Sequence, residues 1–299
     1  MDKIGKNRTV TDQFYTKTDV SLKCIEVFLE HIKVNDKDIL IEPSAGTGSF
    51  SNYFKQNEYN IHAFDIEPKQ DYIKESDFLE LDTSDFKNKN VHCIGNPPFG
   101  KQSSLAKKFI KKNATFCNTI SFILPKSFRK NSYQKCFPLN FHLVKEVDLD
   151  KNSFVIDGKT HNVPCVFQIW VKKDEDRYIE PIHKENGFNF VKKPIIKDLE
   201  INEEGKPTKR ENIFVEEPDF GILRAGGGKK CGRISRDYKD GIGCYPEAWL
   251  FIKLDEKYDK NKFFQEYQKI DWNDDSNVGA RSIDKQRFTK GINRVLESF

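Results

Sequence analysis

The residues best suited to chemistry form the tetrapeptide Asn96-Pro97-Pro98-Phe99. An exocyclic amine on an aromatic base is a poor nucleophile, because its lone pair is delocalised into the ring. The side-chain oxygen of Asn96 and the backbone carbonyl of Pro97 can accept its two N–H bonds and so localise that lone pair. The two prolines stiffen the turn and hold the acceptors in place beforehand. Phe99 offers an aromatic face for stacking, so the tetrapeptide predicts group transfer to a base amine.

A second motif, Glu42-Pro43-Ser44-Ala45-Gly46-Thr47-Gly48-Ser49-Phe50, follows an apolar stretch and opens a helical one. Gly46 and Gly48 allow a tight turn and a close approach of the backbone to a ligand. Asp65 follows Gly46 at the spacing of an acid that binds ribose hydroxyls. Ser51 stands where a pyrophosphate motif has its third glycine. The motif therefore predicts a nucleoside cofactor without a pyrophosphate, which favours S-adenosylmethionine over NAD.

These motifs need elements to position them, and the first half of the chain alternates short apolar segments with amphipathic ones. We expect strands over 38–42, 60–65, 91–95, 119–124, 141–149 and 163–171, and helices over 22–32, 50–56 and 105–112. We also expect a short helix just before Asp77-Phe78. Alternation of this kind predicts an α/β fold with a doubly wound, mostly parallel sheet, at whose carboxyl edge ligands bind. The last two strands should form an antiparallel hairpin, since no helix separates them.

Charge and cysteine usage limit the possible classes of protein. The 50 basic and 46 acidic residues leave a net charge of +4, which permits a polyanionic partner without demanding one. The seven cysteines form no CxxC pair, so we expect buried free thiols and no metal site. No segment is apolar for long enough to span a membrane. We expect an intracellular protein that is a monomer or a weak dimer.

The alternation of elements is lost after about residue 173. We place a domain boundary near 175, with a catalytic domain over 1–175 and a smaller α+β target-recognition domain over 176–299. In the basic stretch at 223–236, three consecutive glycines would let the backbone follow a nucleic-acid groove closely. Its candidate substrate-binding residues are Arg224, Lys229, Lys230, Arg233 and Arg236.

Asn96-Pro97-Pro98-Phe99 resembles the (D/N/S)PP(Y/F/W) motif of amino-methyltransferases that use S-adenosylmethionine. The segment Phe14-Tyr15-Thr16 precedes the glycine motif, and this order resembles the gamma group of DNA adenine-N6 methyltransferases of bacteria, phages and large DNA viruses. The resemblance covers roughly residues 10 to 173 and implies a Rossmann-like methyltransferase fold with a C-terminal recognition domain. The chain departs from it at Ser76, where the family often has Gly, and at Phe99, where Tyr is commoner.

The resemblance also implies roles for individual residues. Phe14, Tyr15 and Thr16 would cap the methionine part of the cofactor. The residues of the glycine motif that would bind it are Glu42, Pro43, Ser44, Ala45, Gly46, Gly48 and Phe50. Asp65 and Ile66 would hold the ribose and flank the adenine, whose edge Asp77 and Phe78 would contact. Asn96, Pro97, Pro98 and Phe99 would hold the target base. Phe154 would be the second aromatic residue to contact that base once it is flipped.

The resemblance leaves alternatives open. The substrate would be DNA or, on the same catalytic domain, RNA; cytosine N4 and protein glutamine are less favoured acceptors. A non-catalytic partner with this fold would not need both motifs intact. Pro164-Cys165 resembles the nucleophile of cytosine-5 methyltransferases, but it lies in an apolar strand, and we interpret Cys165 as a core residue.

Overall fold

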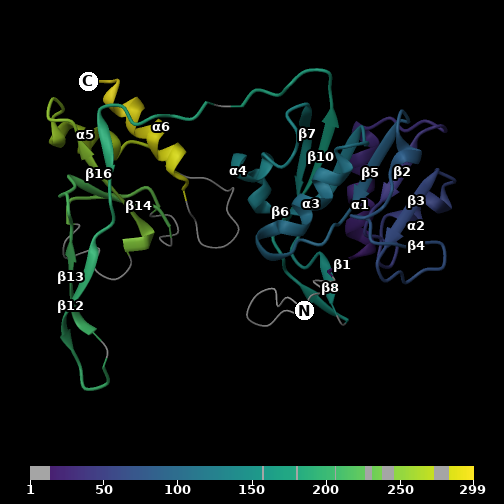
Figure 1. The fold of residues 1–299 in the computed structure, drawn as a ribbon, viewed down its shortest axis with the longest axis horizontal. Helices are drawn as coiled ribbons and strands as arrows, with labels where there is room; N and C mark the ends of the chain where they lie inside the picture. Colours follow the sequence, from purple (N-terminus) through teal and green to yellow (C-terminus); the bar gives the residue numbers. More distant parts are fainter. Residues whose placement is uncertain are drawn as a thin grey trace. The chain divides into compact units, whose positions relative to one another are not determined.

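The computed structural model describes residues 14–156, 158–179, 181–205, 207–225, 231–237, 246–272 and 283–299. The chain divides into two compact units, one up to Tyr178 and the other from Ile179 (Figure 1). We call them the N-terminal and C-terminal units and describe each by itself.

A seven-stranded sheet is the centre of the N-terminal unit, with the order β4-β3-β2-β5-β6-β10-β7. Its strands are β2 (Ile39–Glu42), β3 (Ile61–Asp65), β4 (Lys74–Glu75), β5 (Val91–Gly95), β6 (Thr119–Pro125), β7 (Phe141–Asp148) and β10 (Cys165–Lys172). The first five strands in this order pair in parallel, whereas β10 pairs antiparallel with both β6 and β7. The predicted fold class and the terminal antiparallel pair are therefore confirmed.

Helices cover both faces of this sheet, which is why β2 and β5 are buried along their whole length. Helix α2 (Ser51–Gln56) connects β2 to β3, and α3 (Ser104–Asn113) connects β5 to β6 on the other side of the sheet order. Right-handed crossovers in these opposite directions place the two helices on opposite faces. Helix α1 (Thr18–His31) lies with α2, because Phe28 and Phe54 contact edge to face at 6.1 Å between ring centroids.

A small antiparallel sheet, with the order β1-β8-β9, has no counterpart in the sequence prediction. Its strands are β1 (Tyr15–Thr16), β8 (Phe154–Ile156) and β9 (Lys159–His161). The short helix expected before Asp77 is wrong, because bends and the two-residue strand β4 occupy that segment. The described part of the unit also contains three short 3-10 helices, η1 (Ser84–Phe86), η2 (Lys101–Ser103) and η3 (Lys126–Arg129), and the single turn α4 (Asn131–Gln134).

The C-terminal unit is α+β, as predicted. Its four-stranded antiparallel sheet has the order β11 (Phe188–Val191), β16 (Trp249–Leu254), β14 (Phe220–Leu223) and β15 (Ile234–Ser235). Strands β12 (Ile195–Ile201) and β13 (Pro207–Ile213) form a separate hairpin. The unit also contains η5 (Pro246–Ala248) and two helices, α5 (Lys260–Tyr267) and α6 (Lys285–Leu296), whose N-caps are Asp259 and Asp284.

Two smaller expectations concern the cysteines and the membrane. Cys165 is fully buried in β10, and burial raises its pKa, so it is a core residue and not a nucleophile. Across the described ranges, no helix has the length and apolarity needed to cross a membrane.

Candidate functional site

A cavity of about 340 Å³ lies where β2, β3 and β5 end, at the carboxyl edge of the sheet. It is in the size range of small-molecule sites. There the segment before α1 meets the glycine motif, the tetrapeptide at 96–99, and the pairs Asp65-Ile66 and Asp77-Phe78. The predicted residues that line it are Phe14, Tyr15, Thr16, Glu42, Pro43, Ser44, Ala45, Gly46, Phe50, Asp65, Ile66, Asp77, Phe78, Asn96, Pro97, Pro98 and Phe99.

The glycine turn beneath the cavity depends on backbone conformations that favour glycine. Gly46 has φ +52°, and a Cβ there would lie 3.0 Å from the Tyr15 ring. Gly48 has φ +81°, and a Cβ there would lie 2.3 Å from the Tyr72 hydroxyl oxygen. Gly48 supports the turn without lining the cavity, since its N–H donates to the Ala45 carbonyl at 2.7 Å.

Asp65 connects the end of β3 to this turn. Its Oδ2 accepts the Gly46 N–H at 2.7 Å, and its Oδ1 accepts the Glu67 N–H at 2.8 Å. A carboxylate oxygen has two acceptor positions, so each oxygen can still accept a hydroxyl of a ligand. Asp65 thus holds the glycine turn in place and presents acceptors to the cavity.

The lining of the cavity contains acidic side chains and no basic ones among the described residues. Glu42, Asp65 and Asp77 line the cavity, and none of the described lining residues is Lys, Arg or His. Burial raises the pKa of the Glu42 carboxyl to about 8, although the Ser51 N–H donates a hydrogen bond to it at 2.7 Å. Such a lining suits a ligand that carries positive charge and disfavours a pyrophosphate.

Asn96 follows β5 directly, and two hydrogen bonds fix its amide. Nδ2 donates to the Phe14 carbonyl oxygen at 3.0 Å and to Thr16 Oγ1 at 3.1 Å. A carbonyl oxygen can only accept, so the nitrogen of the amide must face Phe14. Strand β1, paired with β8, therefore decides which way the Asn96 oxygen points.

The Asn96 side-chain oxygen, Oδ1, is buried and has no hydrogen-bond partner in the described part of the protein. A buried acceptor without a partner costs about 1–3 kcal/mol, and such an atom in a native protein calls for an explanation, such as strain, a catalytic role or a bound water. The backbone carbonyl of Asn96 already accepts the Ser44 hydroxyl at 3.2 Å. The side-chain oxygen is thus an acceptor held ready beside the cavity.

The aromatic residues of the site differ from expectation at one position. Phe99 lines the cavity, and its ring lies 6.4 Å from that of Phe14 at an interplanar angle of 23°. Phe154 is fully buried behind Phe14, whose ring it contacts edge to face at 5.9 Å, and it does not line the cavity. The role predicted for Phe154 is therefore not supported: its place in β8 directs the ring into the core.

A strained turn follows Phe99. Gly100, Gln102 and Ser103 have φ values of +67°, +52° and +60°. The two non-glycine residues in the left-handed region cost of the order of 1–3 kcal/mol each, and such strain is concentrated at functional sites. The turn lets η2 and α3 begin directly beside the cavity, where Leu105 and Phe109 join its lining.

Five lining residues were missed from the sequence: Ser49, Ser76, Leu79, Leu105 and Phe109. Ser49 and Ser76 lie beside predicted site residues, so their positions could have been extrapolated. Leu105 and Phe109 belong to the apolar face of α3, and a helix that starts at the carboxyl end of β5 must turn this face towards the site.

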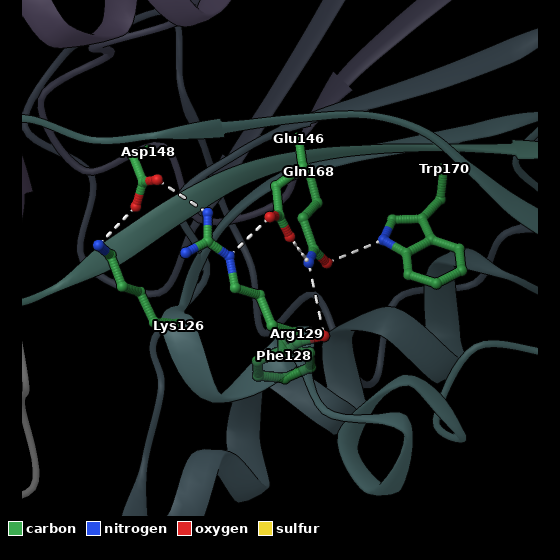
Figure 2. A network of polar contacts seen from close by, with 7 residues as sticks. All are labelled: Lys126, Phe128, Arg129, Glu146, Asp148, Gln168 and Trp170. Carbon is green, nitrogen blue, oxygen red and sulfur yellow. Dashed lines mark hydrogen bonds and ion pairs between the residues drawn. The ribbon is translucent and has the colours of Figure 1, made fainter. Parts of the chain in front are cut away.

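Figure 2 shows a polar network that fastens η3, the segment after β6, to β7 and β10. Arg129 donates through Nε to Glu146 Oε1 at 2.6 Å and through Nη2 to Asp148 Oδ2 at 2.8 Å. The Lys126 Nζ lies 2.5 Å from Asp148 Oδ1. The hydrogen bond from Lys126 lowers the pKa of Asp148. The network extends from Glu146 through the Gln168 amide to the Trp170 indole.

The substrate-binding residues predicted in the C-terminal unit are only partly described. Lys229 and Lys230 lie outside the described residues. The Arg236 guanidinium lies 4.6 Å from the Phe264 ring centroid and donates to Asn261 at 2.8 Å, and that of Arg233 lies 5.9 Å from the Trp249 ring. The Nε of Arg224 is buried without a partner among the described residues.

No protein-family model and no curated protein matches the chain. The similar solved structures include a candidate RNA methyltransferase from Pyrococcus horikoshii, 12% identical over 57% of this chain and 92% of the other, with a TM-score of 0.44. A candidate class I S-adenosylmethionine-dependent methyltransferase from Listeria monocytogenes is 14% identical over 58% and 65%, with a TM-score of 0.41. The methyltransferase subunit of a type I restriction-modification system from Streptococcus thermophilus is 17% identical over 55% and 45%, with a TM-score of 0.40. Because these values are low, we derive the chemistry of the site from this chain's own residues.

Proposed function

We propose that the chain is an S-adenosylmethionine-dependent methyltransferase that methylates the exocyclic N6 amino group of adenine in DNA. The observation that carries the proposal is the fixed amide of Asn96, whose buried Oδ1 has no partner among the described residues. An acceptor held in this way beside a cavity with three carboxyl groups suits an amine that donates N–H bonds while it attacks an electrophile.

The residues of the cavity fit the proposed cofactor. Its sulfonium and ammonium groups are cations, and the described lining supplies Asp65 and Asp77, and Glu42 in its deprotonated form, without a basic side chain. The acceptors of Asp65 suit ribose hydroxyls, and the buried Phe78 and the exposed Ile66 offer apolar surface to an adenine ring. When bound, S-adenosylmethionine supplies an electrophilic methyl group.

The chain's own residues would act on the target amine. Asn96 Oδ1 accepts one N–H of the target, and the Pro97 carbonyl is the candidate acceptor for the other. The two prolines limit motion of these acceptors, so little reorganisation is needed at the moment of transfer. The ring of Phe99 provides a stacking surface, which is worth about 1–3 kcal/mol per base.

DNA is proposed over RNA because of the motif order noted above. The C-terminal unit would read the target sequence, and Arg224 and Arg233 are its candidate base-contacting residues. RNA is the second candidate, on the same catalytic site.

Transfer of a labelled methyl group to pooled DNA, RNA and protein, followed by nucleoside analysis, tests the proposal. We expect label in DNA, recovered as N6-methyladenine. Label in RNA alone would favour the second candidate, and label in protein or in none of the three pools would contradict the proposal.

A pH dependence of cofactor binding should arise from Glu42. Burial keeps this carboxyl neutral below about pH 8, and its deprotonated form attracts the sulfonium. The affinity for S-adenosylmethionine relative to the uncharged thioether S-adenosylhomocysteine should therefore rise as the pH increases towards 8, by at most about tenfold per pH unit, and level off above it. Calorimetry between pH 6 and 9 measures this ratio.

The matched control is Glu42→Gln, which keeps the shape of the side chain and removes its titration. In this variant the ratio should not change with pH. A ratio that changes equally in both proteins would show that Glu42 is not the group responsible.

A further inference from the structure

The chain contains a long stretch of one charge sign that overall composition conceals. Between Asp85 and Glu146 there is no aspartate or glutamate, whereas twelve lysine and arginine residues occur there. The whole chain has 50 basic and 46 acidic residues, so such a stretch is far from its average. It begins before β5, passes through Asn96-Pro97-Pro98-Phe99, and continues through α3 and α4.

Some of these basic side chains already have partners within the protein. Lys126 and Arg129 are paired with Asp148 and Glu146 in the network of Figure 2. Lys112 donates to the Leu81 carbonyl at 2.6 Å, and the Lys107 ammonium lies 4.1 Å from the Tyr133 ring centroid. These side chains serve the fold and are not counted as a binding surface.

Three lysines of η2 and α3 remain exposed: Lys101, Lys108 and Lys111. None of them has an ion-pair partner within the ranges that the structure describes. Lys108 and Lys111 are three residues apart, so they lie on the same side of the helix. The other side of α3 is buried, and its Leu105 and Phe109 line the cavity. We call Lys101, Lys108 and Lys111 the α3 lysines.

The α3 lysines and the cavity have opposite charges although they share one helix. The cavity is lined by carboxyl groups, as a cationic cofactor requires, whereas the outer side of α3 presents ammonium groups to solvent. From this contrast we infer that the α3 lysines bind the sugar–phosphate backbone of the nucleic acid that carries the target base. The inference rests on the proposed function and adds a backbone-binding surface within the N-terminal unit.

A phosphate backbone is the occupant that the pattern favours. Exposed lysines along a helix can contact successive charges of a polymer, and contacts of this kind position a nucleic acid without reading its sequence. An anionic lipid surface is the competing occupant. However, the exposed side of α3 lacks the apolar residues with which a membrane-binding helix enters the interface: its exposed positions are Ser104, Lys108 and Lys111.

The test is the binding of a fluorescent DNA duplex of about 30 base pairs, measured by anisotropy at several salt concentrations. The variant Lys101→Gln/Lys108→Gln/Lys111→Gln should bind about 10- to 100-fold more weakly at low salt. The slope of log Kd against log salt should fall by about two to three, because each lost phosphate contact removes about 0.9 from it. The affinity for S-adenosylmethionine should stay at the parental value.

The matched control is Lys33→Gln/Lys37→Gln/Lys89→Gln, which makes the same change in net charge. These lysines are also exposed, and they lie outside α3, after α1 or just before β2 and β5. The control should bind DNA within about twofold of the parent and keep its salt slope. Equal losses in both variants would mean that only net charge matters and would overturn the inference.

Other outcomes separate this inference from the proposed function. Parental DNA binding by the α3 variant, in a chain that methylates DNA, would overturn the inference alone. A chain that transfers no methyl group, yet binds DNA through the α3 lysines, would contradict the proposed function alone. Binding of the parent to phosphatidylglycerol vesicles and not to DNA, lost in the α3 variant, would identify the surface as membrane-binding and overturn the inference.

Discussion

Replacing Asn96 by alanine should lower the rate of methyl transfer roughly 10²- to 10³-fold, the usual effect of removing one pre-placed hydrogen-bond partner of a transition state. The buried Oδ1 is the acceptor proposed for the target amine, and alanine has no atom in its place. The glycine turn and the carboxyl groups that would hold the cofactor do not depend on it. Phe14 and Thr16 lose the Nδ2 hydrogen bonds, but the pairing of β1 with β8 still holds their segment. Single-turnover kinetics should show the loss, while calorimetry should show nearly unchanged affinity for S-adenosylmethionine.

Asn96→Asp is the matched variant, because it keeps an acceptor oxygen. Its second oxygen would face the Phe14 carbonyl, which now receives the Nδ2 hydrogen bond at 3.0 Å. Repulsion between these two oxygens should lower the rate of methyl transfer. Because one acceptor oxygen remains for the target amine, we expect the rate to fall less than in Asn96→Ala. Near-parental turnover by the alanine variant would show that Asn96 does not act on the target.

Replacing Gly48 by alanine should weaken cofactor binding by at least about tenfold. The new Cβ would stand 2.3 Å from the Tyr72 hydroxyl oxygen, and a non-glycine residue at φ +81° costs about 1–2 kcal/mol in addition. Either the Tyr72 hydroxyl loses its hydrogen bonds with Ser51 and Asn52, or the turn shifts. A shift of the turn moves Gly46 and Ala45, although Gly48 itself does not line the cavity. Titration with S-adenosylmethionine, together with a thermal unfolding curve, measures both consequences.

Two controls separate collision from backbone strain. Gly158 has φ +73°, and a Cβ added there would meet nothing within 4 Å, so Gly158→Ala has the conformational cost alone. The double variant Gly48→Ala/Tyr72→Phe lacks the colliding oxygen. Gly48→Ala should therefore lower the cofactor affinity less in the Tyr72→Phe background than in the parent. Equal losses of thermal stability in the Gly158 and Gly48 variants would contradict the collision argument.

The main sheet could be predicted from sequence because its signals are local. The apolar stretch at 91–95 predicts β5 with the bounds that the structure has, and the stretch at 141–149 predicts β7 to within one residue. The site residues of the glycine turn follow from the same logic, since parallel strands bring their carboxyl ends to one edge.

The parts that could not be predicted depend on distant pairing. Strand β1 has two residues and exists because Tyr15 and Thr16 pair with Val155 and Phe154. No local pattern shows that the Phe14 carbonyl fixes the Asn96 amide, or that Phe154 is buried. The stretch without acidic residues between Asp85 and Glu146, by contrast, is visible in the charge pattern alone. The phosphate contacts that we predict from the sequence nevertheless fall on the glycine-rich basic segment at 223–236 and not on this stretch.

The pairing of β1 with β8 also has a consequence for how the protein is made. Asn96 is oriented by residues 14 and 16, and these are held by a strand that leaves the ribosome well over a hundred residues later. Closing so long a loop has an entropic cost that only the finished packing offsets. A nascent chain can therefore build the glycine turn early, whereas the acceptor geometry at Asn96 becomes complete only after β8 has been synthesised.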